Sequence, residues 1–281
     1  MIDKTNEFSG GRRYVLDNEL AQIVNVSMAL EMPLLLKGEP GTGKTMLAHA
    51  IAENLNMKLI VLNVKSSMKL IDALYQYDTL TRLNDSRFGD TNRDVSNIKD
   101  YLKMGKIGQA FTAEQRVVLL IDEIDKADTD FQDDMLDILD QMQFDIIETD
   151  ETVDANKRPV IIITSNAKKD LSDPFLGRCN FHHIAFPDPK MMRKIVGVHF
   201  PGLDENLARE AIATFYKLRD IEGIEKKPAT RELINWLRAL AVDPDFKAGK
   251  LIGNEVPFLG VLFKKSSDYE KTAALYGQGH S

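Results

Sequence analysis

The residues from Gly38 to Thr45 have the spacing of a phosphate-binding loop, G-x-x-x-x-G-K-[ST]. Glycines in such a loop let the backbone curl, so that several N–H groups and a helix N-terminus converge on phosphate oxygens. Lys44 can then reach the β- and γ-phosphates, and the Thr45 hydroxyl can bind Mg²⁺. The predicted nucleotide-binding segment comprises Gly38, Glu39, Pro40, Gly41, Thr42, Gly43, Lys44, Thr45 and Met46.

The elements around this loop must hold it in place. The apolar run Pro33–Lys37 is typical of a short buried strand. From Lys44 onward apolar residues recur at helical spacing, namely Leu47, Ala48, Ile51, Ala52 and Leu55. A strand before the loop and a helix after it are what phosphate binding requires, whereas a glycine-rich turn without a ligand would need neither.

A second strand, Val117–Ile121, ends in the two acids Asp122 and Glu123. Its continuous apolar run is typical of a central parallel strand buried on both faces. Asp122 is expected to hold Mg²⁺, directly or through water, and Glu123 to act as general base on the water that attacks the γ-phosphate. A solvated acidic turn is the alternative. The second carboxylate favours hydrolysis of the nucleotide. It argues against a small-molecule kinase, which would transfer the phosphoryl group to another acceptor.

A third buried strand, Val160–Ser165, ends at Asn166, whose amide can hydrogen-bond the attacking water or the γ-phosphate. The segment from Asn166 to Asp170 lacks the spacing of a guanine-recognition sequence, so GTP is not predicted. The expected strand from His182 to Phe186 carries two adjacent histidines, which point to opposite faces and cannot easily share a metal.

The other segments are predicted from periodicity and composition. Asp17–Leu30 is expected to form an amphipathic helix and Leu59–Leu62 a short strand. The tract from Lys65 to Arg116 reads as mostly irregular, with an exposed loop from Asp85 to Asn92. A helix beginning near Asp128 uses methionines as core filling. The acidic segment Phe144–Pro159 is expected to form a hairpin, whose charges either are simply solvated or contact a partner.

Helical patterns dominate after the break at Pro187–Pro189, over Met191–His199, Leu207–Arg219 and Arg231–Ala241. The sequence therefore predicts two domains. Residues 1–189 are expected to form an α/β fold, a P-loop NTPase parallel sheet sandwiched by helices, with residues 1–13 flexible. Residues 190–281 are expected to form a small all-helical lid domain.

Composition restricts the classes of function. The chain has 281 residues, a net charge of -7 and a single cysteine. The acidic balance argues against a surface built mainly for nucleic acid or anionic lipid, and one cysteine allows no internal disulfide framework. The polar opening segment is unlike a signal peptide, and no apolar run approaches the roughly 18 residues that a membrane-spanning helix requires. We expect a cytoplasmic protein without membrane insertion.

The order of these features resembles that of the AAA+ ATPases, from about Leu16 onward. Within that superfamily the chain looks most like the MoxR family, especially its CoxD-type members. The similar phrases are Ala73–Tyr77, Ser165–Asp170 followed by Gly177–Cys179, and Lys227–Trp236. The resemblance implies ATP and Mg²⁺ as cofactors.

The resemblance also implies roles for individual residues. Lys44 and Thr45 match Walker A, Asp122 and Glu123 match Walker B, and Asn166 matches sensor 1. Arg178 lies where the family carries an arginine finger that reaches the γ-phosphate in a neighbouring subunit. Arg231 is at the sensor 2 position, with Arg238 as the competitor for that role. A plain surface salt bridge is the alternative for both Arg178 and Arg231.

As a whole, the resemblance implies a homo-oligomer, a hexameric ring, that acts as a remodelling chaperone. Its expected partners are a von Willebrand A domain protein and a client such as a metalloenzyme that it matures. The Lys65–Tyr77 region lacks an aromatic-hydrophobic threading signature, so processive polypeptide translocation is not predicted. Two alternatives stay open: a nucleic-acid-directed AAA+ motor or loader, and a nucleotide-dependent switch that recruits a partner.

Overall fold

The computed structural model describes residues 7–11, 14–89, 94–166, 171–242 and 256–276. The chain divides into two compact units. The first contains Met1–Gly38 and Gly43–Ile184, and the second contains Glu39–Thr42 and Ala185–Ser281. The division after Ile184 falls slightly before the boundary expected at residue 189.

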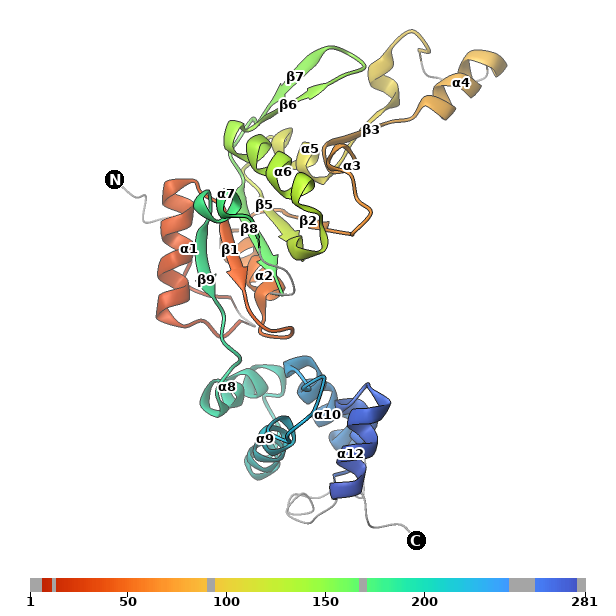
Figure 1. Ribbon diagram of the computed structural model, residues 1–281. Coiled ribbons are helices and arrows are strands. Elements are labelled where there is room, and N and C mark those ends of the chain that lie inside the picture. Colours follow the sequence, from red (N-terminus) through yellow and green to blue (C-terminus); the bar gives the residue numbers. More distant parts are fainter. Residues whose placement is uncertain (1–6, 12–13, 90–93, 167–170, 243–255, 277–281) are drawn as a thin grey trace. The chain divides into compact units, whose positions relative to one another are not determined.

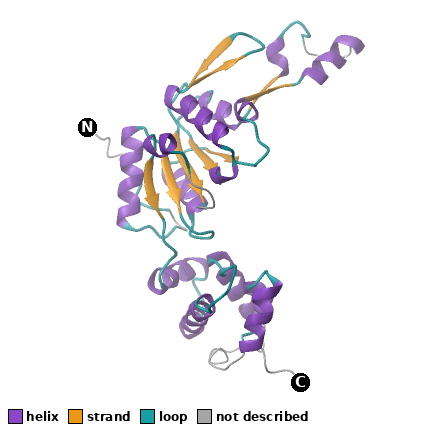
Figure 2. Cartoon of the chain, in the orientation of Figure 1, coloured by secondary structure: helices purple, strands orange, loops and turns teal. Residues whose placement is uncertain are grey.

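The first unit is built on a five-stranded parallel sheet with the strand order β2-β5-β8-β1-β9 (Figures 1 and 2). The strands are β1 (Leu34–Lys37), β2 (Leu59–Asn63), β5 (Val118–Asp122), β8 (Val160–Ser165) and β9 (Asn180–His183). The predicted α/β fold class is therefore confirmed. The strand expected from His182 to Phe186 instead runs from Asn180 to His183, the four residues that pair with Leu34–Lys37 of β1.

Helices bury both faces of this sheet. On one face, Leu34, Leu36 and Leu120 pack in one core with residues of α1 (Asn18–Leu30) and α2 (Lys44–Asn54). On the other, Leu119 and Ile163 pack with residues of α5 (Lys106–Phe111) and α6 (Thr129–Gln141). The continuous apolar runs of β1, β5 and β8 follow from this double burial.

The excursion between β2 and β5 is more ordered than the sequence indicates. It contains α3 (Leu70–Leu74), β3 (Tyr75–Tyr77), α4 (Thr79–Phe88), a 3₁₀ turn (Ile98–Tyr101) and β4 (Leu102–Met104). The expected loop over Asp85–Asn92 is wrong up to Phe88, which ends α4, and residues 90–93 lie outside the described chain. Asp85 is buried because its carboxylate accepts a hydrogen bond from the Tyr101 hydroxyl at 2.9 Å.

The predicted acidic hairpin is present as β6 (Gln143–Ile146) and β7 (Glu151–Asp154), which pair antiparallel. It lies against β3, since the Ile147 backbone N–H donates to the Tyr75 hydroxyl at 3.0 Å. The rings of Tyr75 and Phe144 stack with their centroids 6.3 Å apart. In the N-terminal segment expected to be flexible, Phe8 is buried and its N–H donates to Asn25 Oδ1 at 2.8 Å.

The second unit is helical. Its helices are α8 (Pro189–His199), α9 (Glu205–Arg219), α10 (Thr230–Val242), α11 (Leu259–Leu262) and α12 (Ser266–Tyr276). Trp236 is fully buried in its core and donates its indole N–H to the Pro257 carbonyl at 2.8 Å. The side chains of Asp188 and Asp204 cap α8 and α9. Among the described residues of the whole chain, no helix is long and apolar enough to cross a membrane.

Candidate functional site

The sheet topology brings three predicted segments to one edge. β8 lies between β5 and β1, and all three run parallel, so their carboxyl ends meet. The register pairs Ile121 with Ile163 and Lys37 with Ser165. The residues that follow these strands, including the acids after β5 and the amide after β8, are therefore close neighbours.

The phosphate loop joins β1 to α2, as predicted. Gly41 and Gly43 have φ of 80° and 93°, a left-handed conformation that favours glycine. Lys44 is buried, and its Nζ donates to the Gly38 carbonyl at 2.8 Å. No described side chain caps α2 at Gly43, which leaves the N-terminus of this helix suited to an anion.

Asp122 and Thr45 are in direct contact, although 77 residues separate them. The Thr45 hydroxyl donates to Asp122 Oδ1 at 2.9 Å. Mg²⁺ in nucleotide sites typically takes one or two protein oxygens, with phosphate oxygens and water supplying the rest. A hydroxyl and a carboxylate at the phosphate loop fit that donor set, so these two residues would hold the ion.

Glu123 is held at both carboxylate oxygens. Asn166 Nδ2 donates to Oε1 at 2.9 Å, and Lys126 forms an ion pair with Oε2. This pair raises the pKa of Lys126. Glu123 itself has φ of 61°, a left-handed conformation that costs a non-glycine residue about 1–3 kcal/mol and that clusters at functional sites.

A buried carboxylate supports the Asn166 backbone. Asp125 lies in the 3₁₀ turn Ile124–Lys126 and is almost fully buried. Its Oδ1 accepts the Asn166 N–H at 3.1 Å. The structure thus fixes the backbone of Asn166 through one acid and directs its side chain to another.

Arg178 follows the short helix α7 (Asp173–Gly177) and is bound by two acids of α6. Its Nε lies 2.9 Å from Asp140 Oδ2, and its Nη2 lies 3.2 Å from Asp137 Oδ1. All three side chains are substantially exposed, so this is the surface salt bridge that the sequence leaves open. Next to it, burial raises the pKa of the Cys179 thiol to about 12. A role for Arg178 in a neighbouring subunit stays a prediction.

Arg231 and Arg238 both lie on α10 in the second unit, and both are exposed. Arg231 is in the first turn of the helix, where the Glu232 carboxylate accepts the Ala229 N–H at 3.0 Å. The choice between the two arginines for the sensor 2 role stays a prediction.

The sequence did not indicate Thr164, Lys126 or Asp125 as parts of the site. The signals were present in part, because Thr164 ends the apolar run of β8 and the charged residues Asp125 and Lys126 come shortly after Glu123. The contacts of Thr164 with Asp122 and of Asp125 with Asn166, however, depend on the register between β5 and β8, which the sequence does not show.

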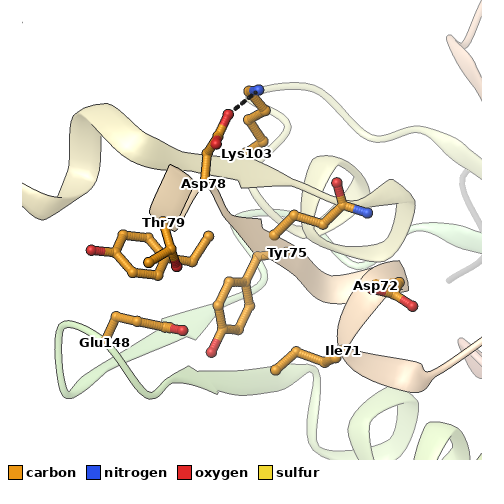
Figure 3. Close-up of a pocket in the computed structure, with 9 residues that line it drawn as sticks. Ile71, Asp72, Tyr75, Asp78, Thr79, Lys103 and Glu148 are labelled. Carbon is orange, nitrogen blue, oxygen red and sulfur yellow. Dashed lines mark hydrogen bonds and ion pairs between the residues drawn. The ribbon is translucent and has the colours of Figure 1, made fainter. Parts of the chain in front are cut away.

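A separate hollow of about 440 Å³ lies between β3 and the β6–β7 hairpin (Figure 3). Tyr75, Asp72, Asp78, Lys103 and Glu148 contribute to its lining. Lys103 Nζ pairs with Asp78 Oδ2 at 3.0 Å. The Thr81 N–H and then Lys103 lower the pKa of Asp78 to about 2, while burial raises the pKa of Tyr75. The hollow is therefore lined by both aromatic and acidic side chains, and it lies in the Lys65–Tyr77 and Phe144–Pro159 regions.

Two curated proteins are similar to parts of this chain. Midasin from Dictyostelium discoideum is 34% identical over 104 residues, which cover 34% of this chain and 2% of Midasin. Lon protease from Mycoplasma mobile is 29% identical over 160 residues, which cover 52% of this chain and 16% of the protease. The chain therefore spans only a small part of either relative.

The profile of the ATPase family associated with various cellular activities (AAA) matches residues 34–187. This range covers more than half of the chain and includes every strand of the central sheet, the phosphate loop, the Asp122–Glu123 pair and Asn166. The chain belongs to the AAA family of ATPases.

Proposed function

We propose that this chain is a Mg²⁺-dependent ATPase in which Glu123 activates the attacking water. The contact between Asn166 and Glu123, beside the pair formed by Thr45 and Asp122, is the observation that carries the proposal. Together these residues provide a base and an amide next to a phosphate loop, an arrangement suited to hydrolysis.

In the proposed reaction, Lys44 and the N-terminus of α2 bind the β- and γ-phosphates. The Glu123 carboxylate accepts a proton from water as the water oxygen forms a bond to the γ-phosphorus. The bond from that phosphorus to the bridging oxygen breaks, and ADP and phosphate leave. Mg²⁺, held by Thr45 and Asp122, would neutralise charge on the β- and γ-oxygens. Asn166 keeps the base oriented and can hydrogen-bond the water.

We further propose that the chain works as a ring, a hexamer in which Arg178 completes the site of the neighbouring subunit. AAA domains in general form rings. The half-exposed position of Arg178 supports the proposal, because an exchangeable surface pair leaves the guanidinium able to move to a phosphate. Arg231 would contact phosphate as the sensor 2 residue.

The finer assignment is a MoxR-type remodelling chaperone, similar to CoxD-type members, that matures a metalloenzyme or another protein complex. The phrases around Tyr75, Asn166 and Arg231 support it. The hollow beside β3 and the hairpin gives a surface for a client or a von Willebrand A domain partner. The net charge of -7 speaks against a motor that acts on nucleic acid.

The test is the Mg²⁺-ATPase rate of the wild type and of Glu123→Gln, with nucleotide affinity measured on the same samples. Loss of the general base should lower kcat by about 10²–10⁴-fold. Affinity for ATP should stay close to the wild-type value, since Gln keeps the size of the side chain. Glu114→Gln, at an exposed position of the same unit, is the matched control. A variant Glu123→Gln that hydrolyses ATP at the wild-type rate would exclude this mechanism.

A further inference from the structure

Thr164 is a buried polar residue inside the most buried strand of the sheet. Its side chain is 1% exposed, and every residue of β8 is buried. A hydroxyl has one proton to donate and two lone pairs to accept. Thr164 uses both capacities on the two Walker B acids, because its Oγ1 donates to Asp122 Oδ1 at 2.7 Å and accepts the Glu123 N–H at 2.9 Å.

The first bond determines how the Asp122 carboxylate is oriented. Two hydroxyls, those of Thr164 and Thr45, converge on the same oxygen, Oδ1, at 2.7 and 2.9 Å. Among the residues that the structure describes, none is seen to donate to Oδ2. Two donors on one oxygen fix the plane of the carboxylate, and the second oxygen is left to face the ion or its water.

The second bond acts on the backbone. Glu123 has φ of 61°, a conformation that needs support from its surroundings. Its N–H finds an acceptor in the Thr164 hydroxyl, which also points at Asp122. One side chain therefore links the orientation of the metal-binding acid to the turn that presents the general base.

We propose that Thr164 is a positioning residue for the Mg²⁺ site, one that sets the metal-facing orientation of Asp122 and the turn at Glu123. The proposal rests on the proposed function of this site as a Mg²⁺-nucleotide site. Partners that orient a metal ligand commonly change metal affinity by about 10–100-fold when they are removed. Thr164 is buried and its hydroxyl is bonded to Asp122 and to the Glu123 backbone, so its effect on the site would pass through these two residues.

Thr164→Val tests this role, since it replaces the hydroxyl with a methyl group of similar size. The probe is a fluorescent ATP analogue, titrated with the protein in EDTA and then at increasing Mg²⁺ concentrations. In EDTA the variant should bind the analogue within about twofold of the wild type. The Mg²⁺ concentration that gives half of the affinity gain should rise about 10–100-fold. Thr164→Ser, which keeps the hydroxyl, should restore the wild-type response.

A control separates this effect from the general effect on stability of replacing a buried threonine with valine. Thr272 is also fully buried, and its hydroxyl donates to the Asp268 carbonyl at 2.7 Å in the second unit. Thr272→Val should leave the Mg²⁺ response of the analogue unchanged. If Thr164→Val does not fold, Thr164→Ala removes the same hydroxyl without adding bulk and should show the same defect in Mg²⁺ response.

Two results would overturn the proposal. One is a Thr164→Val protein with a wild-type Mg²⁺ response, and the other is an equal loss of affinity in EDTA and in Mg²⁺, which would place the residue in the support of the phosphate loop alone. Because the readout is binding, it stays separate from the ATPase test. A wild type that binds the analogue in a Mg²⁺-dependent way but never hydrolyses ATP would refute the proposed function and still test Thr164.

Discussion

Asn166 and Glu123 are 43 residues apart in the chain, yet the amide Nδ2 of Asn166 donates to Oε1 of Glu123 at 2.9 Å. The other oxygen of the same carboxylate is paired with Lys126. The base is thus held from two directions, by a neutral amide and by a cation. This relationship lets the contributions of orientation and charge be separated by substitution.

Asn166→Ala should lower kcat by about 10²–10³-fold, the range seen when one oriented donor is removed from an active site. Its KM for ATP should change little, because Asn166 contacts the base rather than the phosphate loop. Asn166→Asp should be at least as damaging, since it places a second carboxylate beside Glu123. Steady-state kinetics with Asn235→Ala, an exposed asparagine of α10, as control will check this. A large KM effect with unchanged kcat would contradict the assigned role.

The proposed role of Arg178 predicts complementation between two inactive proteins. Arg178→Ala should lower kcat by about 10³–10⁵-fold if the guanidinium completes a neighbouring site. Glu123→Gln keeps its arginine but lacks the base. When the two are mixed, each Arg178→Ala subunit that lies beside a Glu123→Gln subunit regains a complete site, so activity should return in a ratio-dependent way.

The control for this experiment is Arg209→Ala, which alters an exposed arginine of α9 that bonds only to Asn206 in the described chain. Alone, it should keep the wild-type rate, which would show that losing an exposed, singly hydrogen-bonded arginine does not by itself lower activity. Mixtures of Arg178→Ala and Glu123→Gln that stay inactive at all ratios, while both bind ATP and form oligomers, would show that the arginine acts within its own subunit.

Gly108 and Gly197 should respond in opposite directions to alanine. A Cβ at Gly108, in α5, would lie 2.2 Å from the Leu74 carbonyl oxygen, which belongs to the packed backbone. Such overpacking typically costs about 1–3 kcal/mol. A Cβ at Gly197, in α8, meets nothing within 4 Å, so alanine there should stabilise by about 0.5–1 kcal/mol through helix propensity. Urea unfolding of both variants is the measurement, and a stabilised Gly108→Ala would contradict the packing described.

Asp78 should make stability depend on pH at the acid end. Its folded pKa is about 2, below the ordinary 3.8, since it accepts from the Thr81 N–H and pairs with Lys103. A lowered carboxyl pKa contributes stability that is present above the unfolded pKa and is lost as the pH falls through about 2. The difference in urea midpoint between wild type and Asp78→Asn should therefore be largest above pH 4 and shrink toward pH 2. Lys103→Gln should give a smaller change, and a difference that grows on acidification would refute this account.

Much of the central fold could be predicted because its residues follow simple rules. The strands β1, β5 and β8 are continuous apolar runs, and α2 starts at the phosphate loop. The helix α4 could not be predicted, since some of its apolar side chains are exposed to solvent and an acidic side chain is buried. Leu80 and Phe88 are 75% and 78% exposed, whereas Asp85 is buried against Tyr101. Periodicity cannot identify a helix that is held by polar contacts on its inner face.

The site shows the same division. Lys44, Thr45, Asp122 and Glu123 were predicted from local spacing, and the structure brings the last three to the same edge of the sheet as Asn166. Thr164 was not predicted, because its importance arises from the pairing of β5 with β8, where residues 42 apart meet. Contacts of this kind are set by strand register, which no short motif contains.

The position of β1 in the sheet has a consequence for how the protein is made. It pairs with β8 and β9, which begin at Val160 and Asn180. The strand that precedes the phosphate loop can therefore pair only after most of the first unit has been synthesised. Such pairing over long sequence separations gives a high contact order and slow folding. A nucleotide that binds only the completed site stabilises the folded state by mass action, so ATP in the cell would favour completed chains over partly folded ones.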